Sequence, residues 1–418
     1  MNNYYFLIKR FIFLILLYLT YLISKISLIF NIPYLTYLSW LISLRKIQSS
    51  NNSFKKIKVL ILEKSFGVDD IKSITKKKLD HNMEFFLLSR LHAKIVYNHF
   101  QTKKHILYLK YINKIIYYLK KNKKINLIIS FNINYYHENI FQEIDKKIGV
   151  KFLLCQKESL PNEAFVENYS KDLKNKKKFT GDLIVTYNKI YRDVCIESKF
   201  ANKDLINIIG MPRADYLFKK EKNLQTHITF FIIRGSAGLM YGQNKFNWNP
   251  LVNKVLNRTL DFAEENNNQK IIFKSKLISD PETHIFQKII NDRKLPNCEI
   301  IKGGSSHELI SNSKFLVCFH STSIFEGLIS RVPILIPYFD EYKNQLKKFM
   351  CDVSGTKNIF LARNIDEFMN LFNQLSSGTI SYLESERENE KKILENNIGN
   401  ADGKSTIRFM SSIESLFP

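Results

Sequence analysis

Residues 314–342 have the sequence KFLVCFHSTSIFEGLISRVPILIPYFDEY, and the rest of the chain is best interpreted outward from this stretch. An apolar run at 315–319 stops at a hydroxyl-rich loop, and a short helical pattern with a second apolar run at 334–336 follows. This order predicts a strand, a loop, a helix and a second buried strand, which is a βαβ unit. Parallel sheets bind ligands beyond the carboxyl ends of their strands, so we expect the loop to belong to a binding site.

The loop contains His320, Ser321, Thr322 and Ser323, and Glu326 follows in the predicted helix. A first helical turn has backbone N–H groups without intrahelical partners and favours anions, and the three hydroxyls add further donors. A carboxylate can accept two hydrogen bonds from a ribose diol. These residues together predict a nucleotide site. The alternative is an ordinary N-cap, with the glutamate favouring the helix dipole.

The composition indicates a globular chain with a basic surface. A length of 418 residues favours two or three domains, and 45% hydrophobic with 24% charged residues excludes a disordered chain. The net charge of +24 favours a polyanionic partner such as nucleic acid, an anionic membrane or an acidic substrate. No acidic residue precedes Glu63, whereas basic residues punctuate the apolar N-terminus. This distribution favours an anionic membrane surface over nucleic acid.

The N-terminus has two apolar stretches, 11–24 and 26–44, separated by Lys25. The first is shorter than the ~20 residues of a membrane-spanning helix. The second is rich in Tyr and is interrupted by Asn31 and Pro33. We expect an in-plane or re-entrant anchor on the cytoplasmic leaflet, because aromatic residues favour the bilayer interface. One transmembrane helix is an alternative, and a signal peptide is disfavoured because no small-residue cleavage site follows.

Between residues 54 and 380, short apolar runs alternate with helical patterns. Expected strands are 58–62, 126–131, 150–155, 182–187, 206–209, 228–233, 270–273 and 299–301. Expected helices include 84–99, 106–121, 136–147, 190–200 and 251–265. This alternation predicts an α/β protein with two doubly wound, Rossmann-like parallel sheets.

Two further sets of residues follow strands of the second predicted sheet. Arg234 and Gly235 come after the run 228–233, and Lys274 comes after the run 270–273. A glycine lets the backbone approach a ligand, and arginine pairs with phosphate in a forked geometry. The spacing does not fit a P-loop. We therefore predict that these three residues join the loop at 320–323 in binding a donor phosphate.

Other chemistries have little support. The cysteines are odd in number and lack CxxC spacing, which predicts buried thiols in a reducing cytoplasm. A nucleophilic cysteine would need a base partner that the sequence does not identify. No GxSxG elbow occurs, and no His and Glu pair has the spacing of a helical metal site.

Three segments resemble a known family. They are 210–215 (GMPRAD), 320–327 (HSTSIFEG, followed by the strand and the DEY of 333–342) and 402–408 (DGKSTIR). The pattern is similar to GT-B glycosyltransferases that build bacterial surface polysaccharides, such as capsule or lipopolysaccharide, and to CDP-glycerol glycerophosphotransferases. Many relatives carry Lys-x-His-Pro where this chain has Lys-Ser-Lys at 274–276.

The resemblance implies a metal-independent transferase of two domains, and from the apolar, basic N-terminus we expect it on the cytoplasmic face of the inner membrane. Residues 1–53 would be a membrane-associating segment, 54–217 the acceptor-side domain, 226–380 the nucleotide-binding domain and 381–418 a C-terminal helical segment. The donor would be a nucleotide-sugar or CDP-polyol, and the acceptor a polysaccharide or lipid-linked molecule. The donor is a substrate, so no cofactor and no nucleic acid partner are expected.

The general base should come from the acceptor-side domain. Glu158 and Asp69, which follow predicted strands, are the candidates, and His137 is a weaker one. Two alternatives remain open at this point. One is a GT-B-like protein without catalysis that acts in binding or assembly of polysaccharide machinery, and the other is a nucleotide-sugar epimerase.

Overall fold

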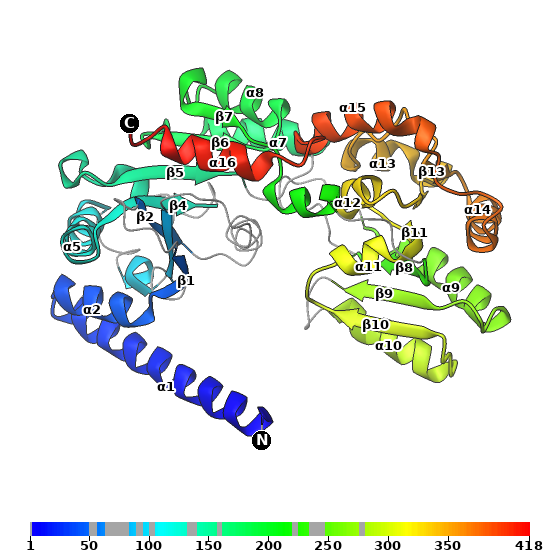
Figure 1. The fold of residues 1–418 in the computed structure, drawn as a ribbon, viewed down its shortest axis with the longest axis horizontal. Coiled ribbons are helices and arrows are strands. Elements are labelled where there is room, and N and C mark those ends of the chain that lie inside the picture. Colours follow the sequence, from blue (N-terminus) through cyan, green and yellow to red (C-terminus); the bar gives the residue numbers. More distant parts are fainter. Residues whose placement is uncertain are drawn as a thin grey trace.

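The computed structural model describes residues 2–49, 57–62, 83–88, 95–99, 105–131, 140–156, 161–219, 225–233, 247–275 and 281–418. Two α/β units lie side by side, each built on its own sheet, and the C-terminal helices run along their upper edge (Figure 1). The predicted fold class, two doubly wound parallel sheets, is therefore confirmed.

The first sheet has the strand order β1-β3-β2-β4-β5-β6-β7. Its strands are β1 Arg45–Ser49, β2 Ile57–Leu62, β3 Met83–Leu88, β4 Ile125–Ser130, β5 Lys151–Cys155, β6 Leu183–Thr186 and β7 Ile206–Ile208. All neighbouring strands pair in parallel except β1, which pairs with β3 in the antiparallel direction.

The apolar runs of this sheet are continuous because both of its faces are covered. Leu60 and Ile128 pack with helix α5 (His105–Lys123) on one face, whereas Val59 and Leu127 pack on the other face with helix α16 (Ser405–Glu414). Successive strand residues point to opposite faces, so both sets must be apolar. The C-terminal helix thereby returns to the first unit (Figure 1).

The second sheet has six parallel strands in the order β10-β9-β8-β11-β12-β13. They are β8 His227–Phe231, β9 Ile271–Ser275, β10 Cys298–Lys302, β11 Ser313–Val317, β12 Ile334–Pro337 and β13 Ile359–Ala362. This is the Rossmann order, in which the chain reverses its direction of travel between β8 and β11. The carboxyl ends of these two strands mark the expected ligand crevice.

The remaining helices complete both units. The α-helices are α7 Glu163–Lys174, α8 Lys189–Glu197, α9 Asn249–Glu265, α10 Pro281–Asp292, α11 His307–Ser311, α12 Ser323–Ile329, α13 Lys343–Phe349, α14 Ile365–Ser377 and α15 Arg387–Ile398. The 3-10 helices are η1 Ile140–Glu143, η2 Lys146–Ile148, η3 Lys203–Leu205, η4 Pro212–Lys219, η5 Asp340–Tyr342 and η6 Glu384–Glu386.

The N-terminus forms two helices, α1 (Asn2–Ile29) and α2 (Pro33–Ser43), which pack against each other and against α5. Asn31 turns the chain between them with a positive φ of 53°, and Pro33 opens the second helix. In the described part of the chain, no helix combines the length and hydropathy of a membrane span.

Two predicted helices are wrong, the first of them in part. Residues 84–88 of the predicted helix 84–99 belong to strand β3, whereas residues 95–99 are helical as predicted. A short apolar run without period does not distinguish a buried strand from a buried helix. The described part of 136–147 forms the short turns η1 and η2 instead of an α-helix, although Gly149 ends η2 at φ 69° as expected of a C-cap.

Candidate functional site

The hydroxyl-rich loop lies at the carboxyl end of β11, beside the reversal of strand order, and leads into α12. Gly327 allows α12 to approach the sheet closely. A Cβ at this position would lie 2.6 Å from Leu316 Cδ1 on β11 and 3.1 Å from Ile334 Cδ1 on β12. The glycine therefore fixes the depth at which the loop and Glu326 sit over the strand ends.

The loop is not a simple N-cap. Thr322 occupies the N-cap position of α12 but makes no side-chain cap bond, whereas the Ser321 hydroxyl accepts a hydrogen bond from the Ser323 backbone N–H at 3.2 Å. The backbone N–H groups of the next three residues donate to the carbonyls of Ser321 and Thr322. Because these N–H groups already have acceptors, side chains are better placed than the first helical turn to bind a ligand.

Glu326 is 5% exposed and is held by two neighbours. Its Oε1 lies 3.7 Å from Arg213 Nε, and its Oε2 accepts a hydrogen bond from the Ser306 hydroxyl at 3.3 Å. Arg213 is itself 6% exposed and donates from Nη2 to Thr322 Oγ1 at 3.5 Å. A buried charge needs a partner of opposite sign, so Arg213 and Glu326 stabilise each other's position at the loop.

Arg213 was not among the predicted site residues, although its segment was recognised. The arginine in the GMPRAD segment was the available signal. Its tertiary partner, 113 residues away in the chain, could not be identified from that signal, because spatial proximity of Arg213 and Glu326 arises only from the fold.

His320 lies where the two units meet. Its Nε2 is 3.4 Å from Asn162 Nδ2, and the Asn162 side chain also caps α7 at Phe165 N and donates to the carbonyl of Phe349. Because Asn162 Nδ2 is a donor, Nε2 acts as the acceptor and the ring proton is assigned to Nδ1. Burial lowers the pKa of His320 to about 4, so the imidazole is neutral at neutral pH.

The His320 Nδ1 atom is inaccessible to solvent and has no hydrogen-bond partner within the described ranges. A buried N–H without an acceptor is costly, so such a group is usually explained by function or by a missing partner. The neutral Nδ1–H is therefore a candidate donor to a bound ligand.

Lys274 lies at the end of β9, next to β8. Its ammonium is buried and donates to the carbonyls of Ser275 at 2.7 Å and Gly303 at 2.6 Å, and burial lowers its pKa. Two of its three N–H donors thus link the last residue of β9 to the residue that follows β10. The predicted contact of the third donor with a phosphate stays a prediction.

Several predicted residues cannot be placed. Arg234, Gly235, Glu158 and Asp69, as well as the weaker candidate His137, lie outside the described residues.

Asp215 ties the linker to the C-terminus. Its carboxylate is fully buried and accepts hydrogen bonds from Asn400 Nδ2 at 2.7 Å, Ser405 N at 3.0 Å and Thr406 N at 2.8 Å. It therefore caps α16, while Arg213 on the same η4 helix reaches the loop before α12. The three segments that resembled a family, 210–215, 320–327 and 402–408, meet around η4.

The described thiols are free, and four of the five cysteines are buried, as predicted, while Cys298 is partly exposed. Burial raises the pKa of Cys195 and Cys351 to about 12 and that of Cys298 to about 11. A thiol with a raised pKa is a poor nucleophile at neutral pH, which favours the structural interpretation.

Two Rossmann-like units, joined by η4 and by a C-terminal helix that crosses back to the first unit, define a GT-B-like architecture (Figure 1). No protein-family model and no curated protein matches the sequence. The fold is nevertheless similar to that of solved structures.

Three of these structures illustrate the likeness. UDP-GlcNAc 2-epimerase from Methanocaldococcus jannaschii has a TM-score of 0.53 at 10% identity, covering 86% of this chain and 100% of the other. The wall teichoic acid polymerase TagF has a TM-score of 0.52 at 10% identity, covering 96% and 97%. HepE from Anabaena, in complex with UDP, has a TM-score of 0.50 at 13% identity, covering 87% and 100%.

These likenesses show the fold at low sequence identity. The chain has a GT-B-like architecture, similar to that of this epimerase, of TagF and of HepE. The resemblance noted in the sequence is thereby shown at the level of the fold.

Proposed function

We propose that this protein is a GT-B transferase that moves a sugar or a polyol phosphate from a nucleotide-activated donor to a surface polysaccharide or lipid-linked acceptor. The observation that carries the proposal is the buried Arg213–Glu326 pair at the strand-order reversal of the second sheet. Maintaining a carboxylate at this depth is costly, and a polar ligand with hydroxyl groups would use it.

Each group has a chemical task in this proposal. Glu326 accepts hydrogen bonds from the ribose hydroxyls, with Arg213 holding its carboxylate in place. The Thr322 and Ser323 hydroxyls and the neutral His320 Nδ1–H donate to phosphate oxygens, which gain negative charge as the nucleotide leaves, while the Ser321 hydroxyl donates to Ser323 Oγ at 3.0 Å. Donors fixed before the reaction stabilise that charge without reorganisation.

The remaining roles are predictions from the sequence. Arg234, Gly235 and Lys274 would contribute to phosphate binding, and Glu158 or Asp69 would act as the general base. The donor is consumed as a substrate, and no cofactor enters the proposal.

The nature of the donor is suggested by two structures of similar fold. One TagF structure is described with CDPG, at a TM-score of 0.52 and 11% identity, and the HepE structure contains UDP. CDP-glycerol and UDP-sugars are therefore the first donors to test.

We also propose attachment to the cytoplasmic face of the inner membrane through α1 and α2. These helices bury polar side chains and expose apolar ones. Ser24 bonds Ser39 at 2.8 Å and Ser27 bonds Thr36 at 2.7 Å, all four being 0% exposed. Interfaces of small polar residues are typical of helices packed in lipid.

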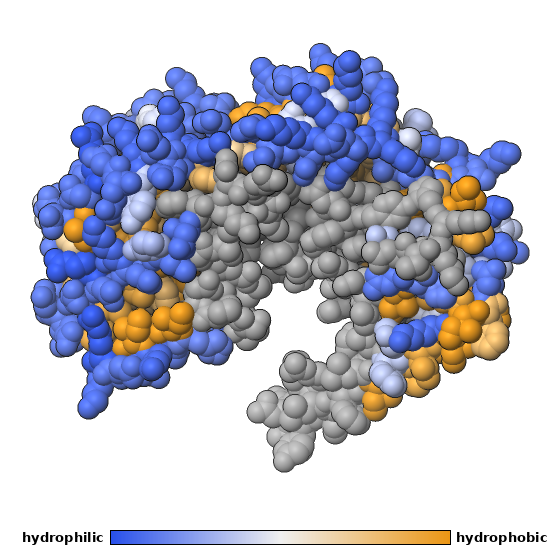
Figure 2. All heavy atoms as spheres, turned by 180° about the vertical axis from the view of Figure 1, so that it is seen from behind, coloured by the Kyte–Doolittle hydropathy of each residue, from blue (hydrophilic) through white to orange (hydrophobic). Residues whose placement is uncertain are grey.

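The exposed face of the two helices carries large apolar side chains that are 41% to 70% exposed: Ile15, Leu16, Leu19, Leu22, Ile26, Ile29, Phe30 and Ile42. Figure 2 shows hydrophobic surface at its lower right, over the helical N-terminal region. Transfer of each half-exposed aliphatic side chain into lipid would contribute about 1 kcal/mol. The summed contribution would favour an in-plane anchor.

An epimerase is the second candidate, because UDP-GlcNAc 2-epimerase has a TM-score of 0.53 to this chain. The two activities differ in their need for an acceptor. An epimerase converts a nucleotide-sugar with no acceptor present, whereas a transferase releases nucleotide only when an acceptor or water receives the group.

The test is a thermal-shift screen of the full chain against UDP-, CDP- and CMP-linked donors, since a ligand that binds the folded state raises its stability. Glu326→Ala should abolish the shift given by the effective donor, whereas Glu388→Ala, at an exposed position of α15, should keep it. Nucleotide release and epimerised product are then measured with and without acceptor. If none of the donors binds, the proposal of an enzyme is refuted, and a non-catalytic role in assembly of the polysaccharide machinery is left.

A further inference from the structure

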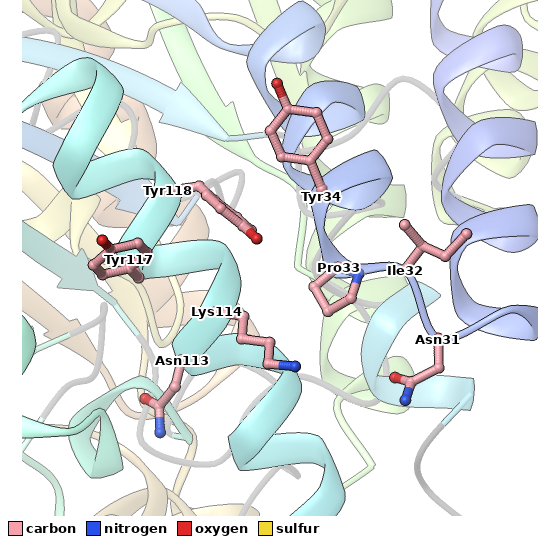
Figure 3. A pocket seen from close by; sticks show the side chains of 8 residues that line it. All are labelled: Asn31, Ile32, Pro33, Tyr34, Asn113, Lys114, Tyr117 and Tyr118. Carbon is pink, nitrogen blue, oxygen red and sulfur yellow. The ribbon is translucent and has the colours of Figure 1, made fainter.

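A groove lies at the elbow between α1 and α2, where these helices meet α5 (Figure 3). Its volume is about 530 Å³, and residues 31–34 of the elbow line one side while residues of α5 line the other. Figure 3 shows the Lys114 ammonium directed from α5 toward Pro33, with the Tyr118 ring entering the same space.

The groove is held in shape by contacts beneath it. The Tyr111 hydroxyl on α5 bonds Ser27 of α1 at 2.7 Å and Thr36 of α2 at 2.5 Å, and all three side chains are buried. The rings of Tyr34 and Tyr118 meet edge to face at 5.2 Å. The elbow is therefore fixed on α5, and the groove walls are set before any ligand binds.

The charge around the groove is positive. Helix α5 has no acidic residue and carries Lys110, Lys114, Lys120, Lys121 and Lys123. The elbow adds no acidic residue either, since no Asp or Glu precedes Glu63. Asp145 contacts the lining through its backbone N–H, which donates to Asn113 Oδ1, so this contact does not use its carboxylate. An anion thus meets an ammonium here without a competing carboxylate in the lining.

The rim of the groove is apolar and exposed. Ile32 and Tyr34 line the groove and are 42% and 47% exposed, and the adjacent Ile29 and Phe30 are 70% and 68% exposed. A free phosphate would leave these side chains in water. A molecule that presents a phosphate to Lys114 and hydrocarbon to the rim would match both parts.

We propose that this elbow groove binds the phosphate headgroup of an anionic membrane lipid, with Lys114 and the Tyr118 hydroxyl as donors and the acyl chains against Ile29 and Phe30. The proposal rests on the membrane attachment proposed above and extends it. The apolar face attaches the protein to membranes of any lipid composition, and the groove adds a preference for anionic headgroups. Lipid selection would orient α1 and α2 at headgroup depth.

The test is co-sedimentation of the full chain with vesicles of phosphatidylcholine alone and of phosphatidylcholine mixed with phosphatidylglycerol. Lys114→Gln should weaken binding to the mixed vesicles about fivefold or more, since one lysine near an anionic surface contributes about that factor. Lys121→Gln, an exposed lysine of α5 outside the groove lining, should change it less than Lys114→Gln does. Neither variant should alter binding to phosphatidylcholine alone.

Equal losses of mixed-vesicle binding in the two variants would refute headgroup binding in the groove and leave only diffuse electrostatic attraction. Competition by inorganic phosphate, beyond that of chloride at the same ionic strength, would identify a free-phosphate site and also overturn it. Absence of wild-type binding to any vesicle would refute attachment as well. The donor thermal shift, measured on the same preparations, reports the transferase proposal separately, because the groove lies outside the donor site.

Discussion

The Arg213–Glu326 pair is the most informative place to perturb this protein. Arg213→Met and Glu326→Gln each remove one charge at nearly constant volume, and the double variant removes both. The two side chains are 7% and 6% exposed, so either variant leaves its partner buried without compensation. The double variant leaves neither of the two charged groups in the site.

The structure sets the magnitude. At 3.7 Å, Coulomb's law with an effective dielectric constant of about 20 gives about 4 kcal/mol of attraction. Removal of one partner of a buried pair costs about 3–5 kcal/mol, whereas replacement of both partners is often close to neutral. We therefore expect each single variant to lose about 3 kcal/mol and the double variant only about 1 kcal/mol, which corresponds to a coupling energy of about 5 kcal/mol in the double-mutant cycle.

The assay is urea denaturation of the four proteins, with donor binding measured by calorimetry on those that are folded. The exposed pair Arg331–Glu384, at 3.5 Å and about half exposed, is the matched control. Its cycle should give no more than about 1 kcal/mol. Additive single effects at Arg213 and Glu326 would refute the coupling. A double variant that regains stability but still fails to bind donor would place the carboxylate in ligand binding.

Three further predictions test other parts of the structure. Burial holds the pKa of His320 near 4, against an ordinary value of 6.5, so the unfolded state binds more protons between these two pH values. The free energy of unfolding should therefore fall as the pH falls through this interval. His320→Gln should flatten that pH dependence in urea titrations. Asp215→Asn places an NH₂ group among three N–H donors and should cost about 3 kcal/mol or more, with faster amide exchange at the start of α16, whereas an unchanged exchange pattern would show that the carboxylate does not hold that helix. Gly399→Ala would bring a Cβ to 1.6 Å from the carbonyl oxygen of Tyr187 and should lower the denaturation midpoint severely. The control Gly149→Ala, at a similar positive φ with open space around it, should cost only about 1 kcal/mol. Equal losses in the two variants would contradict the close packing of α15 on the first unit.

The alternation of strands and helices could be predicted from the sequence, because strands buried on both faces require continuous apolar runs such as VLIL at 59–62. Residues 83–88 mark the limit of that reasoning. MEFFLL is apolar enough for either state, and only its pairing with β1 and β2 makes it a strand.

The hydroxyl loop and Glu326 were likewise visible as a local pattern, since a strand, a turn and a helix follow each other within a few residues. Arg213, Ser306 and Asn162 were not predicted as site residues, because each lies at least 20 positions from its contact in the chain. Local patterns record local geometry, whereas charge compensation and domain contact depend on which distant segments meet.

The sequence by itself thus determined the fold class, the position of the loop after β11 and the apolar, basic character of the N-terminus. Only the tertiary structure decided that η4 joins the three characteristic segments, that Lys274 bonds carbonyls, and that α1 and α2 bury Ser and Thr while exposing Leu and Ile. The physical reason is that residue type and spacing limit which faces can be buried, but the free energy of burial is set by the partner that the fold supplies.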